Sequence, residues 1–192
     1  TAGRIEAGCD EAGRGCLAGP VVAAAVILPP RVRLPGLDDS KKLTAAAREA
    51  LRPLIEQRAV AWSVASASPE EVDRINILNA SFLAMHRAIA GLAMRPQHLL
   101  IDGNRFARYA DLPHTCVVQG DGRYRSIAAA SVLAKTHRDA LMLHAHAEHP
   151  AYGWDRNMGY PTAQHRAAIR THGITLLHRR TFTLLKEEPV LF

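Results

Sequence analysis

Cysteine and aromatic residues are scarce in this sequence, and it has no long apolar run. The three cysteines among 192 residues, Cys9, Cys16 and Cys116, show no C-x-x-C spacing, so we expect reduced thiols in or near the core of a cytoplasmic protein. The longest apolar run, residues 21–28, is far shorter than the roughly 20 residues that a membrane span needs. No signal-peptide pattern opens the chain, so neither secretion nor membrane anchoring is expected.

What is present fits one soluble domain with a basic surface. Apolar residues make up 48% of the chain and charged residues 22%, which predicts a single domain over residues 1–192 with a hydrophobic core, and we expect it to be monomeric. Lys and Arg total 24 against 18 Asp and Glu, and the formal net charge of +6 favours a polyanionic partner. Basicity alone does not identify that partner, because many basic proteins bind no nucleic acid.

Hydrophobic periodicity predicts a mixed α/β pattern without a linker or an internal repeat. The expected strands are residues 4–9, 21–28, 60–66, 98–101 and 115–119. The expected helices are one that begins at the N-cap Thr44 and is kinked or divided at Pro53, residues 76–94, residues 127–146 with Ser126 as N-cap, and residues 163–171. The last helix and a less regular segment form a C-terminal part at about residues 162–192.

Three of the expected strands end in a carboxylate close to glycine. Asp10 and Glu11 follow the first strand, Asp102 precedes Gly103 after the fourth, and Asp121 lies between two glycines after the fifth. Sites in open α/β sheets gather outside the carboxyl ends of strands, so the four acids converge if these strands are neighbours. Four acids in one place resist joint ionisation unless cations neutralise them, and oxygen ligands suit Mg²⁺ or Mn²⁺.

Acids, a hard divalent cation and a basic surface together point to phosphodiester hydrolysis with two metal ions about 3.5 to 4 Å apart. One ion would activate a water, and the other would stabilise the leaving oxygen. The alternative is that these acids serve turn chemistry only. That interpretation fits Gly120-Asp121-Gly122, an ordinary turn sequence, better than it fits the other acids.

The segment Gly13-Arg14-Gly15 directly follows the first two acids. Its glycines allow the backbone to approach a ligand closely, and Arg14 could reach a phosphate or a carboxylate. Residues 13–18 also fit the G-x-G-x-x-A fingerprint of dinucleotide-binding proteins, which requires a helix to begin here. Gly19-Pro20 and a β-branched strand follow instead, so we expect a β-hairpin and not a Rossmann unit.

Several motifs, in order along the chain, resemble those of bacterial ribonuclease HII, the type 2 ribonuclease H. Residues 8–15 (GCDEAGRG) and 17–24 (LAGPVVAA) are similar to the opening signature of this family. Further matches are LDDSKKL at 37–43, IDG at 101–103, GD at 120–121, SIAAASVLAK at 126–135 with Arg138-Asp139, and GYPT at 159–162 with His165. The resemblance covers about residues 5–182, and ordered matches of this length are far more specific than any one motif.

The resemblance implies a ribonuclease H-like fold: a mixed five-stranded sheet flanked by helices, with a helical C-terminal extension. It implies an endonuclease that cuts RNA in RNA–DNA hybrids and on the 5′ side of ribonucleotides embedded in duplex DNA, leaving 3′-hydroxyl and 5′-phosphate ends. Two alternatives remain. A ribonuclease HIII-like enzyme would be expected to carry a threonine where Arg14 stands and an additional N-terminal domain. A noncatalytic nucleic-acid-binding module on the same fold would be expected to lose acids, whereas this chain keeps all four.

The resemblance also assigns roles to residues. The catalytic acids that hold Mg²⁺ or Mn²⁺ are, on this basis, Asp10, Glu11, Asp102 and Asp121. Gly13, Arg14 and Gly15 resemble the family's ribose reader, whose backbone contacts the 2′-hydroxyl that distinguishes RNA from DNA. Tyr160 matches the tyrosine that packs against the sugar at the RNA–DNA junction. The alternative for Tyr160 is a half-buried core tyrosine with a satisfied hydroxyl.

Four basic residues near these motifs are expected to contact phosphates: Lys41, Lys42, Lys135 and Arg138. Ser131, Lys135 and Arg138 fall at i, i+4 and i+7, so they share one helix face. For Arg138 the alternatives are an ion pair with Asp139 or a solvated helix surface.

One departure from the family and one weak similarity complete the sequence evidence. The family commonly has a lysine just before the Gly-Tyr pair, where this chain has Met158, which removes one backbone contact to the substrate. Residues 189–192 (PVLF) resemble short apolar tails that dock on sliding clamps, so a clamp is a candidate partner besides the nucleic acid.

Overall fold

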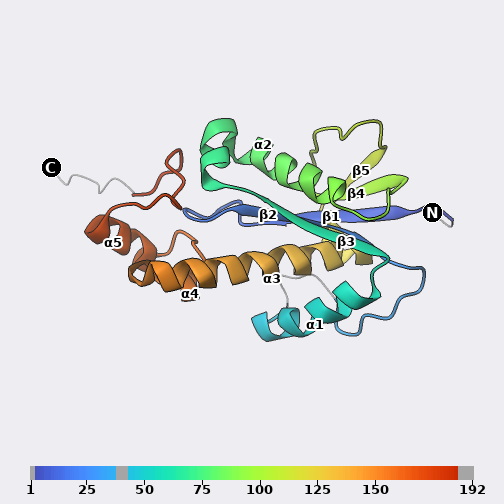
Figure 1. Cartoon of the computed structure of the whole chain (residues 1–192), viewed down its shortest axis with the longest axis horizontal. Coiled ribbons are helices and arrows are strands. Elements are labelled where there is room, and N and C mark those ends of the chain that lie inside the picture. The colour runs from blue at the N-terminus through green and yellow to red at the C-terminus, as the bar shows by residue number, and fades with distance from the viewer. Residues whose placement is uncertain (1–2, 38–42, 186–192) are drawn as a thin grey trace.

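The computed structural model describes residues 3–37 and 43–185, and a five-stranded mixed sheet lies at its centre (Figure 1). The strands are β1 (Glu6–Ala12), β2 (Val21–Ile27), β3 (Ala61–Ala67), β4 (His98–Asp102) and β5 (His114–Val117). Their order in the sheet is β3-β2-β1-β4-β5. β1, β2 and β3 are antiparallel neighbours, whereas β4 and β5 run parallel to β1. The carboxyl ends of β1, β4 and β5 therefore meet at one end of the sheet.

Helices cover both faces of the sheet, with α2 on one face and α1 and α3 on the other (Figure 1). The helices are α1 (Ala45–Arg58), α2 (Pro69–Ala90), α3 (Arg125–Glu148), α4 (Trp154–Asn157) and α5 (Ala163–His172), with 3₁₀ turns η1 (Gly120–Gly122) and η2 (Pro150–Tyr152). Along β2, Val21 and Ala23 pack in the cluster with α2, whereas Ala24 and Val26 pack in the cluster with α3. Successive strand residues face opposite sides, so a strand covered on both faces is apolar throughout.

α3 lies very close to β1 at Gly8. A Cβ atom at Gly8 would lie 2.2 Å from the carbonyl carbon of Ser126, so the strand and the helix can meet here only because this residue has no side chain. Ala128, Ala129 and Ala130 in the next turn of α3 are buried and small, which maintains the close packing. The helix is therefore held against the strand that carries Asp10.

α2 begins with a capping box and is interrupted at Asn76. The Ser68 hydroxyl accepts a hydrogen bond from the Glu71 N–H, and the Glu71 carboxylate accepts one from the Ser68 N–H. Asn76 has non-helical dihedral angles, φ 64° and ψ 164°, and its side-chain oxygen accepts a hydrogen bond from the Asn79 N–H. Asn76 thus caps a second helical segment. The sequence pattern predicted this second segment, from residue 76, and missed the first.

The C-terminal part of the described chain packs against the loop between β1 and β2. Leu17 N–H donates to the Gly159 carbonyl at 2.8 Å, and the Leu17 carbonyl accepts from the Arg179 N–H at 2.8 Å. An isolated bridge joins Ala18 to His178. α4 and α5 are followed by an irregular segment, residues 173–185. The loop after β1 therefore packs against chain on both sides of α5, far from the loop in sequence.

The structure confirms the mixed five-stranded sheet flanked by helices and corrects several boundaries. β1 continues to Ala12 instead of ending at residue 9. α1 begins at the predicted N-cap Thr44 but includes Pro53 in a single 14-residue helix, so it is not divided there. α3 begins at Arg125 and its N-cap is Tyr124, not Ser126.

The antiparallel pairing of β1 and β2 confirms the hairpin that replaces a Rossmann unit. Cys9 and Cys16 are buried, Cys116 is partly buried, and all three are free thiols, as expected. No helix in the described ranges combines the length and the apolar character that crossing a membrane requires.

Candidate active site

The first two acids lie on a part of β1 that extends beyond β4. β1 pairs with β4 only as far as Cys9, but it pairs with β2 as far as Ala12. Asp10 and Glu11 are therefore inside the strand and not after it, which corrects the expected boundary. β2 keeps this segment extended while β4 ends at Asp102, so the parallel strands leave room at their carboxyl ends.

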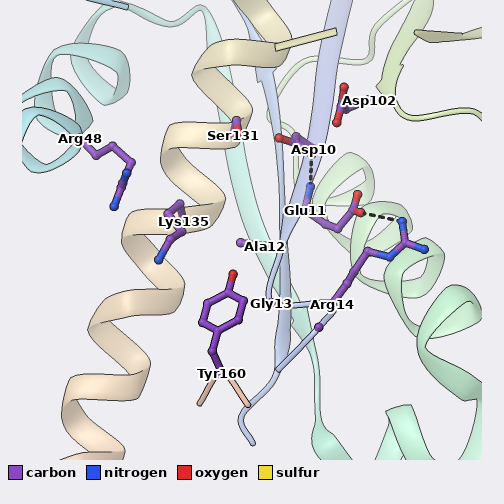
Figure 2. A pocket seen from close by; sticks show the side chains of 11 residues that line it. Asp10, Glu11, Ala12, Gly13, Arg14, Arg48, Asp102, Ser131, Lys135 and Tyr160 are labelled. Carbon is purple, nitrogen blue, oxygen red and sulfur yellow. Dashed lines mark hydrogen bonds and ion pairs between the residues drawn. The ribbon is translucent and has the colours of Figure 1, made fainter. Parts of the chain in front are cut away.

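A cavity of about 400 Å³ opens at this end of the sheet (Figure 2). Acids from β1 and β4 line it on one side, α1 and α3 on another, and the loop after β1 with Tyr160 on a third. Its lining residues are Asp10, Glu11, Ala12, Gly13, Arg14, Gly15, Arg48, Asp102, Ser131, Lys135 and Tyr160. The structure thus brings three of the four predicted acids and the predicted reader residues to one cavity.

Asp10 is the most deeply buried acid of this cavity, with 5% of its surface exposed. Its Oδ1 accepts a hydrogen bond from the Glu11 N–H at 2.7 Å, and Ser131 on α3 also bonds to its carboxylate. Burial raises the pKa of Asp10 well above its usual value, and the neighbouring charges of Glu11 and Asp102 raise it further. An ionised Asp10 is therefore stabilised by any cation that enters the cavity.

The Glu11 side chain points toward α2, so Glu11 lines both the cavity and a small recess that it shares with Ser81 and Asp102. Burial raises the pKa of Glu11, whereas the nearby Arg14 guanidinium lowers it and the Asp102 charge raises it. Arg14 Nη1 lies 3.2 Å from Glu11 Oε1, and the Arg14 side chain is 51% exposed (Figure 2). The Glu11 side chain is only 12% exposed, so the exposed Arg14 partly neutralises a buried acid.

The other two acids are linked through the turn η1. Asp102 Oδ1 accepts a hydrogen bond from the Gly120 N–H at 2.7 Å. Asp121, the next residue, is 3% exposed, and its Oδ1 accepts from the Gly122 N–H at 3.1 Å. Asp121 does not line the cavity, but its turn is fixed to an acid that does. β5 ends at Val117, so Asp121 belongs to η1 and does not directly follow a strand as expected.

The loop after β1 and Tyr160 face each other across the cavity mouth (Figure 2). Gly13 has φ 94°, a conformation that favours glycine, and a Cβ there would lie 2.0 Å from Arg138 Nε. Gly15 has open space where a Cβ would be. Tyr160 is 40% exposed, and its hydroxyl points into the cavity toward Ala12.

A chain of buried rings fixes the backbone of Tyr160. His165 Nδ1 donates to the Tyr160 carbonyl at 2.9 Å, and His165 Nε2 accepts from Trp154 Nε1 at 3.0 Å. His178 Nε2 lies 3.3 Å from His165 Nε2, and His178 Nδ1 accepts from the Thr175 N–H at 3.0 Å. These contacts give each imidazole one proton, on Nδ1 of His165 and on Nε2 of His178. Burial lowers the pKa of both rings, that of His178 to about 4, which keeps them neutral.

The remaining basic residues of the cavity come from two helices. Lys135 on α3 lines the cavity as expected, and its Nζ donates to both carboxylate oxygens of Asp139. Arg48 on α1 also lines it, and its Nη1 donates to the Leu43 carbonyl at 2.6 Å. Sequence reasoning missed Arg48, because only the packing of α1 against α3 brings it here and no local motif marks it. It noted Ser131 as a neighbour of Lys135 but not as a partner of Asp10.

Three expected phosphate contacts have other outcomes. Lys41 and Lys42 lie outside the described residues. Arg138 is completely buried, so the structure corrects its expected role as a surface contact. Its guanidinium donates to the carbonyl oxygens of Pro20, Met158 and Ala18. It is neither paired with Asp139 nor part of a solvated helix face.

The donor set of the cavity suits a divalent metal ion. Carboxylate oxygens are the ligands that hard cations such as Mg²⁺ and Mn²⁺ prefer. Two of the acids, Asp10 and Glu11, have raised pKa values that a bound cation would reverse. Across residues 3–37 and 43–185, no three acidic, histidine or cysteine side chains already surround one point closely enough to enclose an ion. The fit therefore rests on the donor chemistry and on the charge that remains to be neutralised.

This sheet order, with acids at the carboxyl ends of β1 and β4 and helices on both faces, defines a ribonuclease H-like hydrolase. The family model described as ribonuclease HII matches residues 7–185. A ribonuclease HII of Parabacteroides distasonis is 66% identical over 189 residues, which cover 98% of this chain and 95% of the relative. This chain belongs to the ribonuclease HII family. It is therefore an endoribonuclease of the ribonuclease H class.

Two solved structures share this architecture. The ribonuclease H2 of Pyrococcus horikoshii OT3 is 26% identical, with a TM-score of 0.77, and the match covers 93% of this chain and 94% of that one. The ribonuclease HII of Archaeoglobus fulgidus, solved in a complex with PCNA, is also 26% identical with a TM-score of 0.77, over 96% of this chain and 98% of that one. The expected fold class is thus confirmed.

Proposed function

We propose that this chain cuts RNA in RNA–DNA hybrids and on the 5′ side of ribonucleotides embedded in duplex DNA, leaving 3′-hydroxyl and 5′-phosphate ends. One observation carries the proposal: a single cavity holds the acids Asp10, Glu11 and Asp102 at one side and the Gly13–Gly15 loop with Tyr160 at the other. Acids alone would support a nuclease without sugar selectivity. A glycine-lined backbone and an exposed tyrosine beside them support selection of a ribose.

Asp10, Glu11 and Asp102 would hold Mg²⁺ or Mn²⁺, and Asp121 would join them through the turn that Asp102 fixes. Bound there, two divalent ions would polarise the attacking water and stabilise the leaving oxygen. The protein's own part is to keep the carboxylates in place before the metal arrives. The Glu11 N–H orients Asp10, and the Gly120 N–H orients Asp102.

The sugar would be recognised between the loop and the tyrosine. Gly13 and Gly15 leave backbone groups accessible at the cavity wall, where a 2′-hydroxyl can both donate and accept hydrogen bonds. A deoxyribose lacks that group, so it would leave these backbone partners unsatisfied, which is a strong basis for rejection. The Tyr160 ring, 40% exposed at the same mouth, offers a flat apolar surface for the neighbouring sugar.

The phosphates would be bound by basic side chains around the cavity. Arg14 is 51% exposed, and while its Nη1 pairs with Glu11, its other guanidinium donors would meet a phosphate. Lys135 uses two hydrogen bonds on Asp139, and since an ammonium group has three donors, one remains for a phosphate oxygen. Arg48 faces the same cavity from α1, and we add it to the expected contacts Lys41 and Lys42.

An incision assay tests this function. Three duplexes of one sequence are compared with Mg²⁺ and with Mn²⁺: one with a single ribonucleotide, one RNA–DNA hybrid and one of DNA only. We expect the chain to cut the first two on the 5′ side of a ribonucleotide and to leave the third intact. Asp10→Asn should lower the rate by about 10³-fold or more, because it removes a metal ligand. Undiminished incision by Asp10→Asn would overturn the proposal.

The same assay separates the two alternatives. A ribonuclease HIII-like enzyme without junction specificity would cut the hybrid but spare the single ribonucleotide. A noncatalytic binding module would bind all three duplexes and cut none. A monomeric state and docking on a sliding clamp through residues 189–192 stay predictions, and those residues lie outside the described part of the chain. The PCNA complex of the Archaeoglobus fulgidus relative supports the second of these.

A further inference from the structure

Two arginines are completely buried between the loop after β1 and the C-terminal part. Arg138 on α3 donates from Nε to the Pro20 carbonyl at 3.1 Å, from Nη1 to Met158 at 2.9 Å and from Nη2 to Ala18 at 3.1 Å. It has 0% of its surface exposed. One guanidinium therefore ties the loop after β1 to the residue that stands two positions before Tyr160.

Arg179 binds the same loop from the other side. It is also 0% exposed, and its Nε and Nη2 donate to the Gly19 carbonyl at 3.0 and 2.9 Å. Its Nη1 donates to the carbonyl of Arg14, the central residue of the predicted reader, at 2.9 Å. Burial lowers the pKa of Arg179 to about 10, so it is still protonated at neutral pH.

These contacts are unusual because the charges are buried without acidic partners. In the described part of the chain, neither guanidinium forms an ion pair with a carboxylate. Burying a charge is expensive unless it is hydrogen-bonded, and here every guanidinium nitrogen donates to a backbone carbonyl. A planar guanidinium with five donors can reach several carbonyls at once, which a lysine ammonium of different shape cannot reproduce. The contacts thus depend on arginine and on the course of the loop.

The backbone is shaped to fit these side chains. A Cβ at Gly13 would lie 2.0 Å from Arg138 Nε, and a Cβ at Gly19 would lie 3.3 Å from Arg138 Nη2. A Cβ at Gly159 would lie 2.5 Å from the Ala18 carbonyl oxygen. The glycine before Tyr160 and the first glycine of the reader loop thus both lie against the arginines or against the backbone that the arginines hold.

We propose that Arg138 and Arg179 are positioning residues that fix the spacing between the Gly13–Gly15 loop and Tyr160, and that this spacing sets the rate of cutting at a ribonucleotide. The inference rests on the proposed function, because it takes the loop and Tyr160 as the sugar-reading part of the cavity. Neither arginine lines the cavity, so neither touches the substrate. Their effect is transmitted through the carbonyl oxygens of Arg14 and Met158, and the Arg138 guanidinium also lies over the Tyr160 ring, 6.0 Å from its centroid.

The test separates positioning from phosphate binding by kinetics. Arg138→Lys and Arg179→Lys keep the charge but lose the planar fork, and Arg156→Lys, whose side chain is 70% exposed, is the matched control. We expect kcat at a single ribonucleotide to fall about 10- to 100-fold in both variants, because a displacement of about 1 Å in a reactive geometry has effects of that size. KM should change less than about twofold, and the salt dependence of binding should stay as in the wild type.

The opposite pattern overturns the proposal. A raised KM with an unchanged kcat would identify Arg138 as a phosphate contact, as the sequence first indicated. A kcat that equals that of Arg156→Lys would also overturn it. Wild-type activity is measured beside the variants, so an inactive wild type refutes the proposed function itself. If the wild type cuts only hybrids, the same kcat and KM comparison is made on the hybrid.

A measurement on the unchanged protein covers variants that fail to fold. The Nε–H protons of Arg138 and Arg179 should exchange with water at least 10³-fold more slowly than that of Arg156, and they should stay slow when the hybrid binds without metal. Rapid exchange of either proton in the wild-type chain contradicts a fixed clamp and overturns the proposal. Slow exchange combined with unfolding of the lysine variants supports it, since the fork is then required to hold the loop.

Discussion

Two groups of buried charge lie on either side of the Gly13–Gly15 loop, and they are satisfied to different degrees. Asp10 and Glu11 are adjacent acids with raised pKa values, and their repulsion remains in the folded chain. Arg138 and Arg179 each donate three hydrogen bonds to carbonyl oxygens. The acids retain an unfavourable free energy that a cation can relieve, whereas the arginines have little left to gain. In this molecule, incomplete neutralisation marks the acids of the cavity, and hydrogen bonding at every guanidinium nitrogen marks the arginines that hold the loop.

The contrast between the two groups predicts that the buried arginines are needed for stability. Arg179→Met keeps an unbranched side chain and removes all of its hydrogen bonds, which leaves the carbonyls of Gly19 and Arg14 without these donors. We expect the free energy of unfolding to fall by about 3 kcal/mol, since each unsatisfied buried acceptor costs about 1 to 3 kcal/mol. Urea denaturation measures this. The adjacent Arg180 is exposed, so Arg180→Met should change stability by less than about 0.5 kcal/mol. Equal effects of the two variants would refute the comparison.

The C-terminal part that holds the loop should also lose stability in acid, because its buried imidazoles are neutral in the folded chain. His178 has a pKa of about 4 in the folded chain and an ordinary value of 6.5 when unfolded, so the unfolded chain binds a proton first as the pH falls. Stability from this group is complete above pH 6.5 and is lost between 6.5 and 4. From pH 7 to pH 5 the loss should be about 2 kcal/mol.

Denaturation of His178→Gln at pH 7 and at pH 5 should show that this pH-dependent loss of stability has disappeared. The matched control is His144→Gln, because the His144 side chain is 80% exposed. The control should keep the wild-type slope of stability against pH. If the wild type and His178→Gln shared one slope, the buried ring pair would not be the source of the acid sensitivity.

A substitution in the acidic pair should change stability in the opposite direction, and by the smallest amount of the three. Asp10→Asn removes a buried charge that repels Glu11 and Asp102, so the metal-free protein should be as stable as the wild type or more stable by up to about 1 kcal/mol at pH 7. Added Mg²⁺ should raise the Tm of the wild type and not that of the variant. Asp111→Asn, at a side chain that is 79% exposed, is the control and should keep the Mg²⁺ response. A marked loss of stability in Asp10→Asn would mean that the acids, too, are structural.

Much of the fold was predictable because the sheet is simple in sequence. β2 is a continuous apolar run, and Thr44 and Thr162 are unambiguous N-caps. The predictions failed where a distant partner decides the outcome. β1 is longer than its apolar pattern because β2 pairs with its acidic residues, and Asn76 interrupts α2 by capping a new segment within it.

The site residues that belong to local sequence motifs were predictable. Asp10, Glu11 and Asp102 end up at one cavity because their strands are neighbours and parallel, which a sequence pattern can express. Arg138 was misread because an arginine on a helix is ordinarily exposed, and its carbonyl partners come from segments about 20 and 120 positions away. Arg48 was missed for the related reason that only the packing of α1 against α3 directs it to the cavity.

The contact at Gly8 governs where α3 delivers its functional side chains. From Gly8 to Asp10 the strand advances by about 6.6 Å, and from Ser126 to Ser131 the helix advances by about 7.5 Å in the same direction. These nearly equal steps bring Ser131 to the carboxylate of Asp10. A single methyl group at Gly8, which would lie 2.2 Å from the helix backbone, would push the two elements apart. The alignment of Asp10 with its helix partner Ser131 is thus set two residues upstream, by an atom that is absent.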